Sequence, residues 1–260
     1  MIFYELFELL NQPTILHAWI PSSSCHLFPY ETCKTHLKGK VLELGCGIGR
    51  GTASLIENAE HYTGLDKNET CIAELTERYP QHDFKIVDLP DLSVFEDNTF
   101  DFAVTFQVIE HIKNDSKFLA EIHRVLKPGG KLILTTCNRK SSLSRNPWHE
   151  REYTAVQLRD LMKKYFPELS LQGVHGNEKV TEYMKRNKAS VDKAMRFDIF
   201  KMQWWLPNWI LRKPYEYMNR RNREKLADQG DELTRSILWT DHYLSDSIDD
   251  CLDFYYIGTK

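Results

Sequence analysis

The sequence predicts a doubly wound α/β fold with a mainly parallel sheet, and three observations support this prediction. Short apolar runs of strand length alternate with segments whose apolar residues recur at helical spacing. The apolar runs are dense in hydrophobic residues, as in strands that are covered on both faces. A glycine-rich turn, VLELGCGIGRGT (41–52), directly follows the first run. Open sheets of this class bind ligands at such strand ends, so we expect a site there.

Several segments have the composition of strands and are separated by turn residues or helical segments. One helix is expected over about 118–126, ending at the KPGG turn (127–130), and a second over about 158–165, before Pro167. The expected strands are KVLELG (40–45), HYTGLD (61–66), FKIVDL (84–89), FDFAVTF (100–106), KLILTTC (131–137), LSLQGV (169–174) and the terminal run CLDFYYIGTK (251–260).

Length and composition set bounds on the class of protein. The chain has 260 residues, of which 42% are hydrophobic and 27% are charged, a globular balance with room for a sizeable core. The formal net charge of -3 gives no overall footprint for nucleic acid or for an anionic membrane, so nucleic acid is not expected as a partner. Six cysteines without C-x-x-C spacing are expected to be reduced. Because Glu5, Glu8 and Pro13 interrupt the first apolar segment, neither a signal peptide nor a spanning helix is expected, and the predicted location is cytoplasmic.

Four regions are predicted along the chain. Residues 1–39 form a helical lead-in, and residues 40–176 form the core of alternating strands and helices. Residues 177–249 depart from that rhythm and are polar, helical and then aromatic and basic. An insert of that length is too long for a plain connection before the last strand at 250–260, so we expect a helical cap over the strand ends.

The glycine turn follows neither of two familiar phosphate-binding patterns. It lacks the G-x-x-x-x-G-K-[ST] spacing of a phosphate loop and the third glycine of the dinucleotide motif G-x-G-x-x-G. It has instead an acid before three alternate glycines, at Glu43, Gly45, Gly47 and Gly49. A tight turn that binds nothing is the plain alternative. The second strand, however, ends at Asp66, where an acid can accept both hydroxyls of a ribose.

Polar groups also follow the third and fourth predicted strands. Asp88, with Leu89 beside it, stands where a carboxylate or a main-chain group can bond an adenine amino group. Gln107, Glu110 and His111 follow the fourth strand. Because the carboxyl ends of parallel strands meet at one edge, these groups are expected beside the glycine turn.

ELGCGIGRGT, TGLD, VDLPDLSVFEDNTFDFAVTFQVIEHI and FLAEIHRVLKPGGKLILTT together resemble the motif series of class I S-adenosylmethionine-dependent methyltransferases, over roughly residues 40–176. The resemblance is to the methyltransferase type 11 and ubiquinone-biosynthesis-methyltransferase-like group. It implies a Rossmann-like, seven-stranded methyltransferase sheet of order 3-2-1-4-5-7-6, whose antiparallel last strand CLDFYYIGTK would supply. NPWHEREYTAVQLRDLMKKYF is similar to an N-P-x-H-x-x-E-[FY]-[ST] segment of methyltransferases associated with sugars and glycans.

The resemblance also implies which residues hold S-adenosylmethionine and its product S-adenosylhomocysteine. Asp66, with Lys67 next to it, would hold the ribose, and Asp88 and Leu89 the adenine. Gln107 would lie at the sulfonium side. The methionyl end would be lined by Glu43, Gly45, Cys46, Gly47 and Gly49.

Methyl transfer to a hydroxyl needs a base to remove its proton. His111 and His149 are the candidates, because both follow strand ends and histidine titrates near neutrality. The alternatives are a packing role for His111 and a surface pair of His149 with Glu152. Together with Glu110, the two histidines also resemble part of the metal site of some RNA ribose methyltransferases and ubiquinone-biosynthesis O-methyltransferases. Gln107 replaces the first acid of that pattern, so no metal is expected.

The composition of residues 197–225 does not identify the methyl acceptor. FKMQWWLPNWILRKPYEYMNRRNREK mixes tryptophans and tyrosines with arginines and lysines. This composition suits a lid over a small-molecule or glycan acceptor, a face on a membrane surface, or a face on which RNA bases stack. It also suits helices that simply pack against the core. Among the functional roles, the lid is favoured. The predicted function is O-methylation of a small molecule or glycan. The alternatives are an RNA ribose methyltransferase and a non-catalytic module that binds S-adenosylmethionine.

Overall fold

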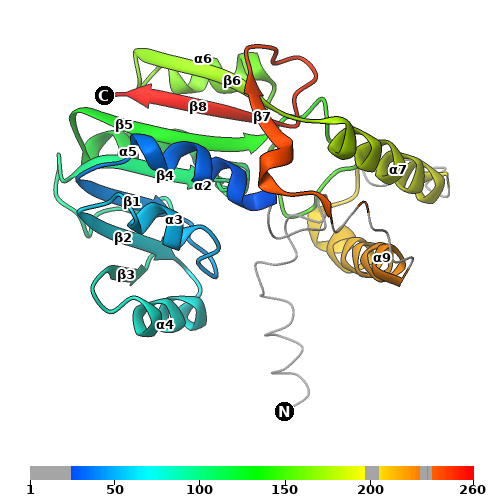
Figure 1. Ribbon diagram of the computed structural model, residues 1–260, viewed down its shortest axis with the longest axis horizontal. Helices are drawn as coiled ribbons and strands as arrows, with labels where there is room; N and C mark the ends of the chain where they lie inside the picture. Colours follow the sequence, from blue (N-terminus) through cyan, green and yellow to red (C-terminus); the bar gives the residue numbers. More distant parts are fainter. Residues whose placement is uncertain (1–24, 197–204, 229–232, 234–235) are drawn as a thin grey trace.

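The computed structural model describes residues 25–196, 205–228, 233 and 236–260. Its centre is an eight-stranded mixed sheet of order β3-β2-β1-β4-β5-β8-β6-β7 (Figure 1). Residues 1–24 of the predicted lead-in lie outside the described residues, as do 197–204 and most of 229–235 of the predicted insert.

The first five strands are parallel, and the last three run antiparallel to their neighbours. β8 pairs antiparallel with both β5 and β6, and β7 pairs antiparallel with the end of β6. The bounds are β1 (Lys40–Leu44), β2 (His61–Asp66), β3 (Asp83–Ile86), β4 (Phe100–Phe106), β5 (Leu126–Cys137), β6 (Glu168–Gly176), β7 (His242–Ser245) and β8 (Asp253–Thr259).

The predicted mixed α/β sheet is confirmed, but its strand count of seven was wrong. β8 occupies the place expected for the terminal strand, between β5 and β6. The eighth strand, β7, comes from within the predicted insert at 177–249. Four residues are too few to show a strand period, so the sequence pattern does not separate such a segment from a loop. The insert therefore contributes an edge strand as well as helices, and the four region boundaries stay predictions.

Helices cover both faces of the sheet (Figure 1). α2 (Phe28–Cys33) and α3 (Thr52–Ile56) pack on one face, where their apolar side chains join Val41, Val104 and Ile133. α5 (Asp115–Val125) and α6 (Ala155–Met162) supply the apolar side chains of a second, larger cluster. α4 (Glu69–Arg78) lies against β3 at the sheet edge. Dense apolar strands are thus buried from two sides, as predicted.

Local capping groups fix where the two predicted helices begin. The Asn114 side chain accepts the Lys117 amide at the start of α5. Thr154 and Gln157 form a reciprocal capping box at the start of α6. At the other end of α5, the KPGG turn (127–130) is the first part of β5, so that strand begins earlier than predicted. β3, in contrast, ends at Ile86, which leaves Asp88 and Leu89 in the following loop.

Two longer helices lie beyond the carboxyl ends of the parallel strands (Figure 1). They are α7 (Glu178–Met195) and α9 (Asn208–Asp228). Val180 and Tyr183 of α7 form a small buried cluster with Ile237. Among the described helices, none is long and apolar enough to cross a membrane. Short 3-10 helices complete the fold at Cys25–Leu27 (η2), Lys34–His36 (η3), Ile109–His111 (η4) and Trp239–Asp241 (η5).

Candidate active site

The glycine turn connects β1 to α3 at the carboxyl edge of the sheet. Gly45, Gly47 and Gly49 have φ values of 83°, 52° and 74°, in the region that favours glycine. The Gly45 amide donates to the Leu65 carbonyl over 2.8 Å, which ties the turn to β2. A Cβ atom on Gly45 would lie 2.6 Å from the Val108 side chain. The turn thus requires glycine for its backbone angles and for close packing.

Asp66 faces the glycine turn from the end of β2. One carboxylate oxygen accepts the Gly47 amide over 2.8 Å, and the other accepts the Asn68 amide over 2.9 Å. Each oxygen has a second lone pair, so the half-buried group can accept further donors. Lys67, the next residue, is exposed. Asp66 therefore lies where the ribose-binding acid was predicted.

Glu43 is buried below the turn and is held by two phenols. The Tyr30 hydroxyl donates to one of its oxygens over 2.8 Å, and the Tyr62 hydroxyl donates to the other. Burial raises the pKa of Glu43 to about 7, although the two hydrogen bonds oppose that shift. Cys46 is also buried, and burial raises the pKa of its thiol, so it is a small packed side chain beside the turn.

Tyr30 links the lead-in helix α2 to the turn. Its ring packs edge-on against Phe106, with ring centroids 4.7 Å apart. A Cβ atom on Gly51 would overlap the Tyr30 ring. Neither Tyr30 nor Tyr62 is predicted from the sequence as a partner of Glu43, because nothing in the spacing of either residue marks it as one.

Asp88 and Leu89 lie on the loop that leaves β3. The Val87 amide donates to the Asp66 carbonyl over 2.9 Å, which holds the start of this loop beside the end of β2. Asp88 is exposed, whereas Leu89 is half-buried and packs against the main core. Both residues are thus at the predicted edge, next to the ribose-binding candidate.

Gln107 follows β4 with a φ of 57°, and its amide donates to the Thr135 carbonyl over 2.9 Å. Its side chain is hydrogen-bonded to Asp253 of β8. Burial raises the pKa of Asp253 to about 6, and the bond with Gln107 opposes the shift. Asp253 was missed because it stands in a terminal strand, far in sequence from every motif.

His111 lies in η4 and presents one ring nitrogen without a partner. Its Nδ1 atom is 3.0 Å from the Trp148 carbonyl oxygen. A carbonyl only accepts, so Nδ1 carries the proton and Nε2 keeps its lone pair. Among the described residues, buried Nε2 has no hydrogen-bond partner. Burial, reinforced by nearby His149, lowers the pKa of His111 to about 4, which keeps the ring neutral near pH 7.

His149 has both ring nitrogens engaged. Nδ1 is 2.8 Å from a carboxylate oxygen of Glu152, and Nε2 is 2.9 Å from the Asn146 amide nitrogen. The Asn146 oxygen accepts the Trp148 amide, so the side-chain nitrogen of Asn146 is the donor to His149. The pair with Glu152 considered from the sequence is present, but only 9% of the His149 side chain is exposed.

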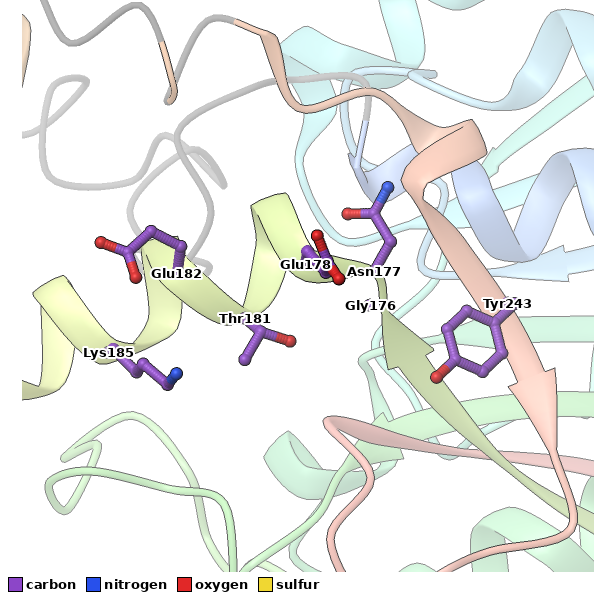
Figure 2. A pocket seen from close by; sticks show the side chains of 7 residues that line it. All are labelled: Gly176, Asn177, Glu178, Thr181, Glu182, Lys185 and Tyr243. Atoms are coloured by element: carbon purple, nitrogen blue, oxygen red, sulfur yellow. The ribbon is translucent and has the colours of Figure 1, made fainter.

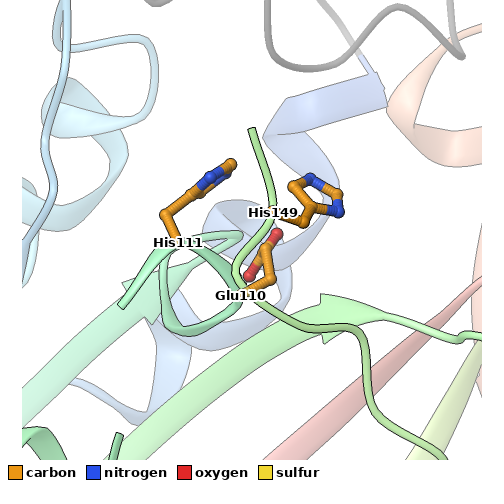
Figure 3. A group of neighbouring side chains, drawn as sticks. All are labelled: Glu110, His111 and His149. Atoms are coloured by element: carbon orange, nitrogen blue, oxygen red, sulfur yellow. The ribbon is translucent and has the colours of Figure 1, made fainter. Parts of the chain in front are cut away.

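Figure 3 shows Glu110 and His111 on η4 and His149 on a separate loop beside it. The imidazole rings are 4.8 Å apart between centroids, at an angle of 74°. One Glu110 oxygen accepts the Thr136 hydroxyl over 2.9 Å, and the other is buried without a partner among the described residues. Burial raises the pKa of Glu110 to about 7. Glu110 and His111 of η4 thus meet His149, which follows a different strand.

The same three residues have the spacing of a metal site. Ligand atoms of Glu110, His111 and His149 lie within 4.8 Å of one another. One carboxylate and two imidazoles suit a transition metal better than Mg²⁺, which prefers oxygen ligands. His149 would first have to release Asn146 or Glu152 to bind a metal.

A pocket of about 660 Å³ opens between the start of α7 and β7 (Figure 2). Glu178, Glu182 and Lys185 line it from the helix, and Tyr243 lines it from β7. None of the predicted cofactor or base residues lines it.

The comparisons with known proteins agree with this arrangement. Residues 42–134 match the methyltransferase domain family. A probable S-adenosylmethionine-dependent methyltransferase of Mycolicibacterium smegmatis is 38% identical over 128 residues, which cover 47% of this chain and 49% of that protein. Residues 42–134 thus form a methyltransferase domain that is similar to those of S-adenosylmethionine-dependent methyltransferases.

Two further similarities concern other methyltransferases. The ubiquinone biosynthesis O-methyltransferase of Xanthomonas oryzae pv. oryzae is 30% identical over 115 residues, covering 42% of this chain and 48% of that enzyme. The chain therefore spans about half the length of these two curated relatives. A Thermotoga maritima structure, an S-adenosylmethionine-dependent methyltransferase described as a possible histamine N-methyltransferase, shares the fold with a TM-score of 0.55. It is 19% identical, and the alignment covers 99% of this chain and 94% of that one.

S-adenosylmethionine is the cofactor of this family of methyltransferases. Two structural features fit it. The turn requires glycine at position 45, where a Cβ atom would meet Val108, and the Asp66 carboxylate beside the turn can accept further donors.

Proposed function

We propose that this protein transfers the methyl group of S-adenosylmethionine to an oxygen of a small molecule or glycan, with His111 as the general base. The observation that carries the proposal is the buried Nε2 atom of His111, which has a free lone pair and no partner among the described residues. A hydroxyl that enters beside this atom would complete its hydrogen bonding.

Binding of the cofactor is assigned to the edge formed by β1, β2 and β4. The turn from Gly45 to Gly49 would hold the methionyl part, and Asp66 with Lys67 the ribose. Asp88 and Leu89 would meet the adenine, and Gln107 the sulfonium side. Glu43 would support the turn through its phenol partners.

The reaction needs in-line attack and removal of one proton. S-adenosylmethionine supplies a methyl group on a sulfonium, which leaves as a neutral thioether. The proton of the acceptor hydroxyl would pass to Nε2 of His111 as the oxygen attacks, and the resulting imidazolium would later return that proton to water. The Trp148 carbonyl keeps the other proton on Nδ1 throughout.

The surroundings of His111 favour particular roles for its neighbours. The Glu110 carboxylate would stabilise the imidazolium, since opposite charges attract strongly in a buried site. His149 lowers the pKa of His111 and so keeps the base unprotonated. A base with a low pKa is best matched to a hydroxyl that loses its proton readily, so a phenolic or enolic oxygen fits better than a simple sugar hydroxyl.

The sequence support for oxygen as the acceptor atom is the similarity to a ubiquinone biosynthesis O-methyltransferase. The formal net charge of -3 and the neutral Gln107 count against RNA ribose as the acceptor.

The proposal is tested in two stages. Calorimetry with S-adenosylmethionine and S-adenosylhomocysteine should show binding of both, and binding of neither would overturn it. Labelled methyl transfer is then measured to phenols, sugars and amines of matched size. We expect the labelled methyl group to appear in an ether product, which is stable in mild alkali. Transfer only to amines, or binding without transfer to any acceptor, would contradict the oxygen assignment.

A further inference from the structure

α9 exposes one face of mixed aromatic and basic side chains. Trp209 and Tyr217 are 73% and 63% exposed, and Lys213 lies exposed between them. Arg220, one turn further along, is exposed as well. Spacings of four, four and three residues place these four side chains on the same side of a helix. We call Trp209, Lys213, Tyr217 and Arg220 the α9 face.

The charge of α9 is opposite in sign to that of the whole chain. The helix contains six basic and three acidic residues, whereas the formal net charge of the protein is -3. Glu216 lies among Arg212, Lys213 and Arg220, whose positive charges oppose the rise that burial causes in its pKa. The α9 face is therefore a positive surface on an otherwise acidic protein, and its complement is an anionic surface.

We propose that the α9 face docks on the surface of a lipid bilayer that contains anionic lipids. Tryptophan and tyrosine rings have an apolar body and a polar edge, which suits the boundary between headgroups and acyl chains. Lysine and arginine between them can reach lipid phosphates. The face lies on the outside of a helix, whereas single-stranded RNA is held in grooves that track its backbone.

The docked helix would stand directly beside the candidate active site. The Arg145 side chain donates to the Leu206 carbonyl over 3.2 Å and to the Asn208 side chain at the start of α9. The Arg212 guanidinium lies 4.2 Å from the centre of the Trp148 ring. Trp148 is the residue whose carbonyl accepts the hydrogen bond from Nδ1 of His111. The loop of Arg145 and Trp148, which fixes the tautomer of His111, thus contacts α9, the helix that would bind the membrane.

This placement specifies the class of methyl acceptor, an inference that rests on the proposed function. A site held at a bilayer surface would meet acceptors that reside there. The acceptor is therefore an amphiphile whose apolar part is in the bilayer and whose hydroxyl-bearing part reaches the interface.

The docking is tested with the full chain and two kinds of vesicle, one of phosphatidylcholine alone and one that also contains phosphatidylglycerol. We expect flotation with the anionic vesicles and much weaker flotation with the neutral ones. Raising the salt concentration should reduce the binding, because exposed charges are screened. Equal flotation in both, or in neither, would overturn the proposal.

Variants identify the surface. Trp209→Ser with Tyr217→Ser should lower the partition coefficient for anionic vesicles by about tenfold or more, and Lys213→Glu with Arg220→Glu should do the same. Tyr243→Ser, on β7, and Lys164→Glu, after α6, are matched controls at exposed positions outside α9 and should bind like the parent. Variants of the α9 face that bind vesicles as well as the parent would overturn the proposal.

Two further measurements keep this result apart from that of the proposed function. Every variant should bind S-adenosylhomocysteine like the parent, which shows that it is folded. Methyl transfer to a water-soluble acceptor without vesicle binding would overturn the docking and leave the proposed function standing. Binding of a labelled single-stranded RNA that depends on the α9 face, in place of vesicle binding, would also overturn the docking.

Discussion

The Nδ1 atom of His111 lies 3.0 Å from the main-chain oxygen of Trp148, which leaves Nε2 as the ring nitrogen with a lone pair to offer. A main-chain carbonyl holds the tautomer more firmly than a mobile side chain would, because it is part of the loop itself. Six predictions concern the consequences of this site for catalysis, binding, stability and metal dependence.

His111→Gln should lower kcat by about 10²- to 10⁴-fold, because the base is removed and an amide cannot accept the proton. The dissociation constant of S-adenosylhomocysteine should stay within a factor of about two, since the ring lies on the acceptor side. Single-turnover transfer and calorimetry give the two values. His36→Gln, at an exposed histidine of η3, is the control and should behave like the parent.

The decrease in the parent's methyl-transfer rate at low pH, the acid limb of its rate profile, gives an independent check on the role of His111. Its pKa is lowered to about 4, so the neutral base persists as the pH falls and is lost only near that value. In His149→Ala, transfer should decrease while cofactor binding remains, because the loop loses the bonds to Glu152 and Asn146. The acid limb should also move to higher pH, since the pKa of His111 is lowered by burial and also by His149, and the second contribution is gone. An unchanged limb would contradict this role.

Asp66→Ala should weaken S-adenosylmethionine binding by about 100-fold or more, through loss of the ribose contact and of the bond that holds the Gly47 amide. Asp66→Asn retains one acceptor oxygen, so it should lose less affinity for S-adenosylmethionine than Asp66→Ala. Calorimetry on both variants separates the two contributions. Asp83→Ala, at the exposed start of β3, is the control. Parent-like binding by Asp66→Ala would show that the ribose lies elsewhere.

Tyr30→Phe should weaken binding of S-adenosylhomocysteine by about tenfold, because Glu43 loses one of its two phenol partners below the turn. Binding of 5′-methylthioadenosine, which lacks the amino-acid part, should hardly change. Tyr256→Phe removes a comparable bond, from a buried hydroxyl to the Ala155 carbonyl, on the other side of the sheet. Equal losses for both ligands would indicate general damage to the fold and not a role at the methionyl end.

Glu110→Gln should be more stable than the parent at about pH 8, and the difference should vanish near pH 4. The pKa of Glu110 is raised from 4.5 to about 7, so the folded state binds its proton more tightly than the unfolded state. That stability is complete below about 4.5 and is lost as the pH rises through about 7. The shift corresponds to roughly 2–4 kcal/mol at high pH. Urea unfolding at several pH values measures the difference, and a constant difference would refute the assignment.

Methyl transfer should survive EDTA. Both nitrogens of His149 are bonded to protein groups, and Gln107 offers no negative charge to a cation. Activity is compared before and after dialysis against EDTA, with elemental analysis of the protein. If activity disappeared and returned with Mg²⁺ or Zn²⁺, the Glu110, His111 and His149 group would be a metal centre.

The parts of this site that are local in sequence were the predictable ones. Gly45, Gly47 and Gly49 have positive φ because alternate glycines after a strand favour such a turn. Asp66 reaches them because parallel neighbours end at the same edge. The meeting of His111 and His149 was also implied, since each follows a strand that ends there.

The rest depends on contacts between segments that share no pattern. Tyr62 and Asp253 stand among apolar strand residues, where nothing distinguishes a residue that bonds Glu43 or Gln107 from one that packs in the core. Asn146 orients His149 through a loop conformation that short-range spacing does not specify. β7 was missed because it is only four residues long.

The overlap between the Tyr30 ring and any Cβ on Gly51 also has a consequence for sequence divergence. A side chain at position 51 becomes compatible with this packing only when a smaller residue replaces Tyr30. The same replacement removes a phenol from Glu43. Positions 30, 43 and 51 are therefore expected to covary among homologous chains, because the three residues together connect the lead-in helix to the turn.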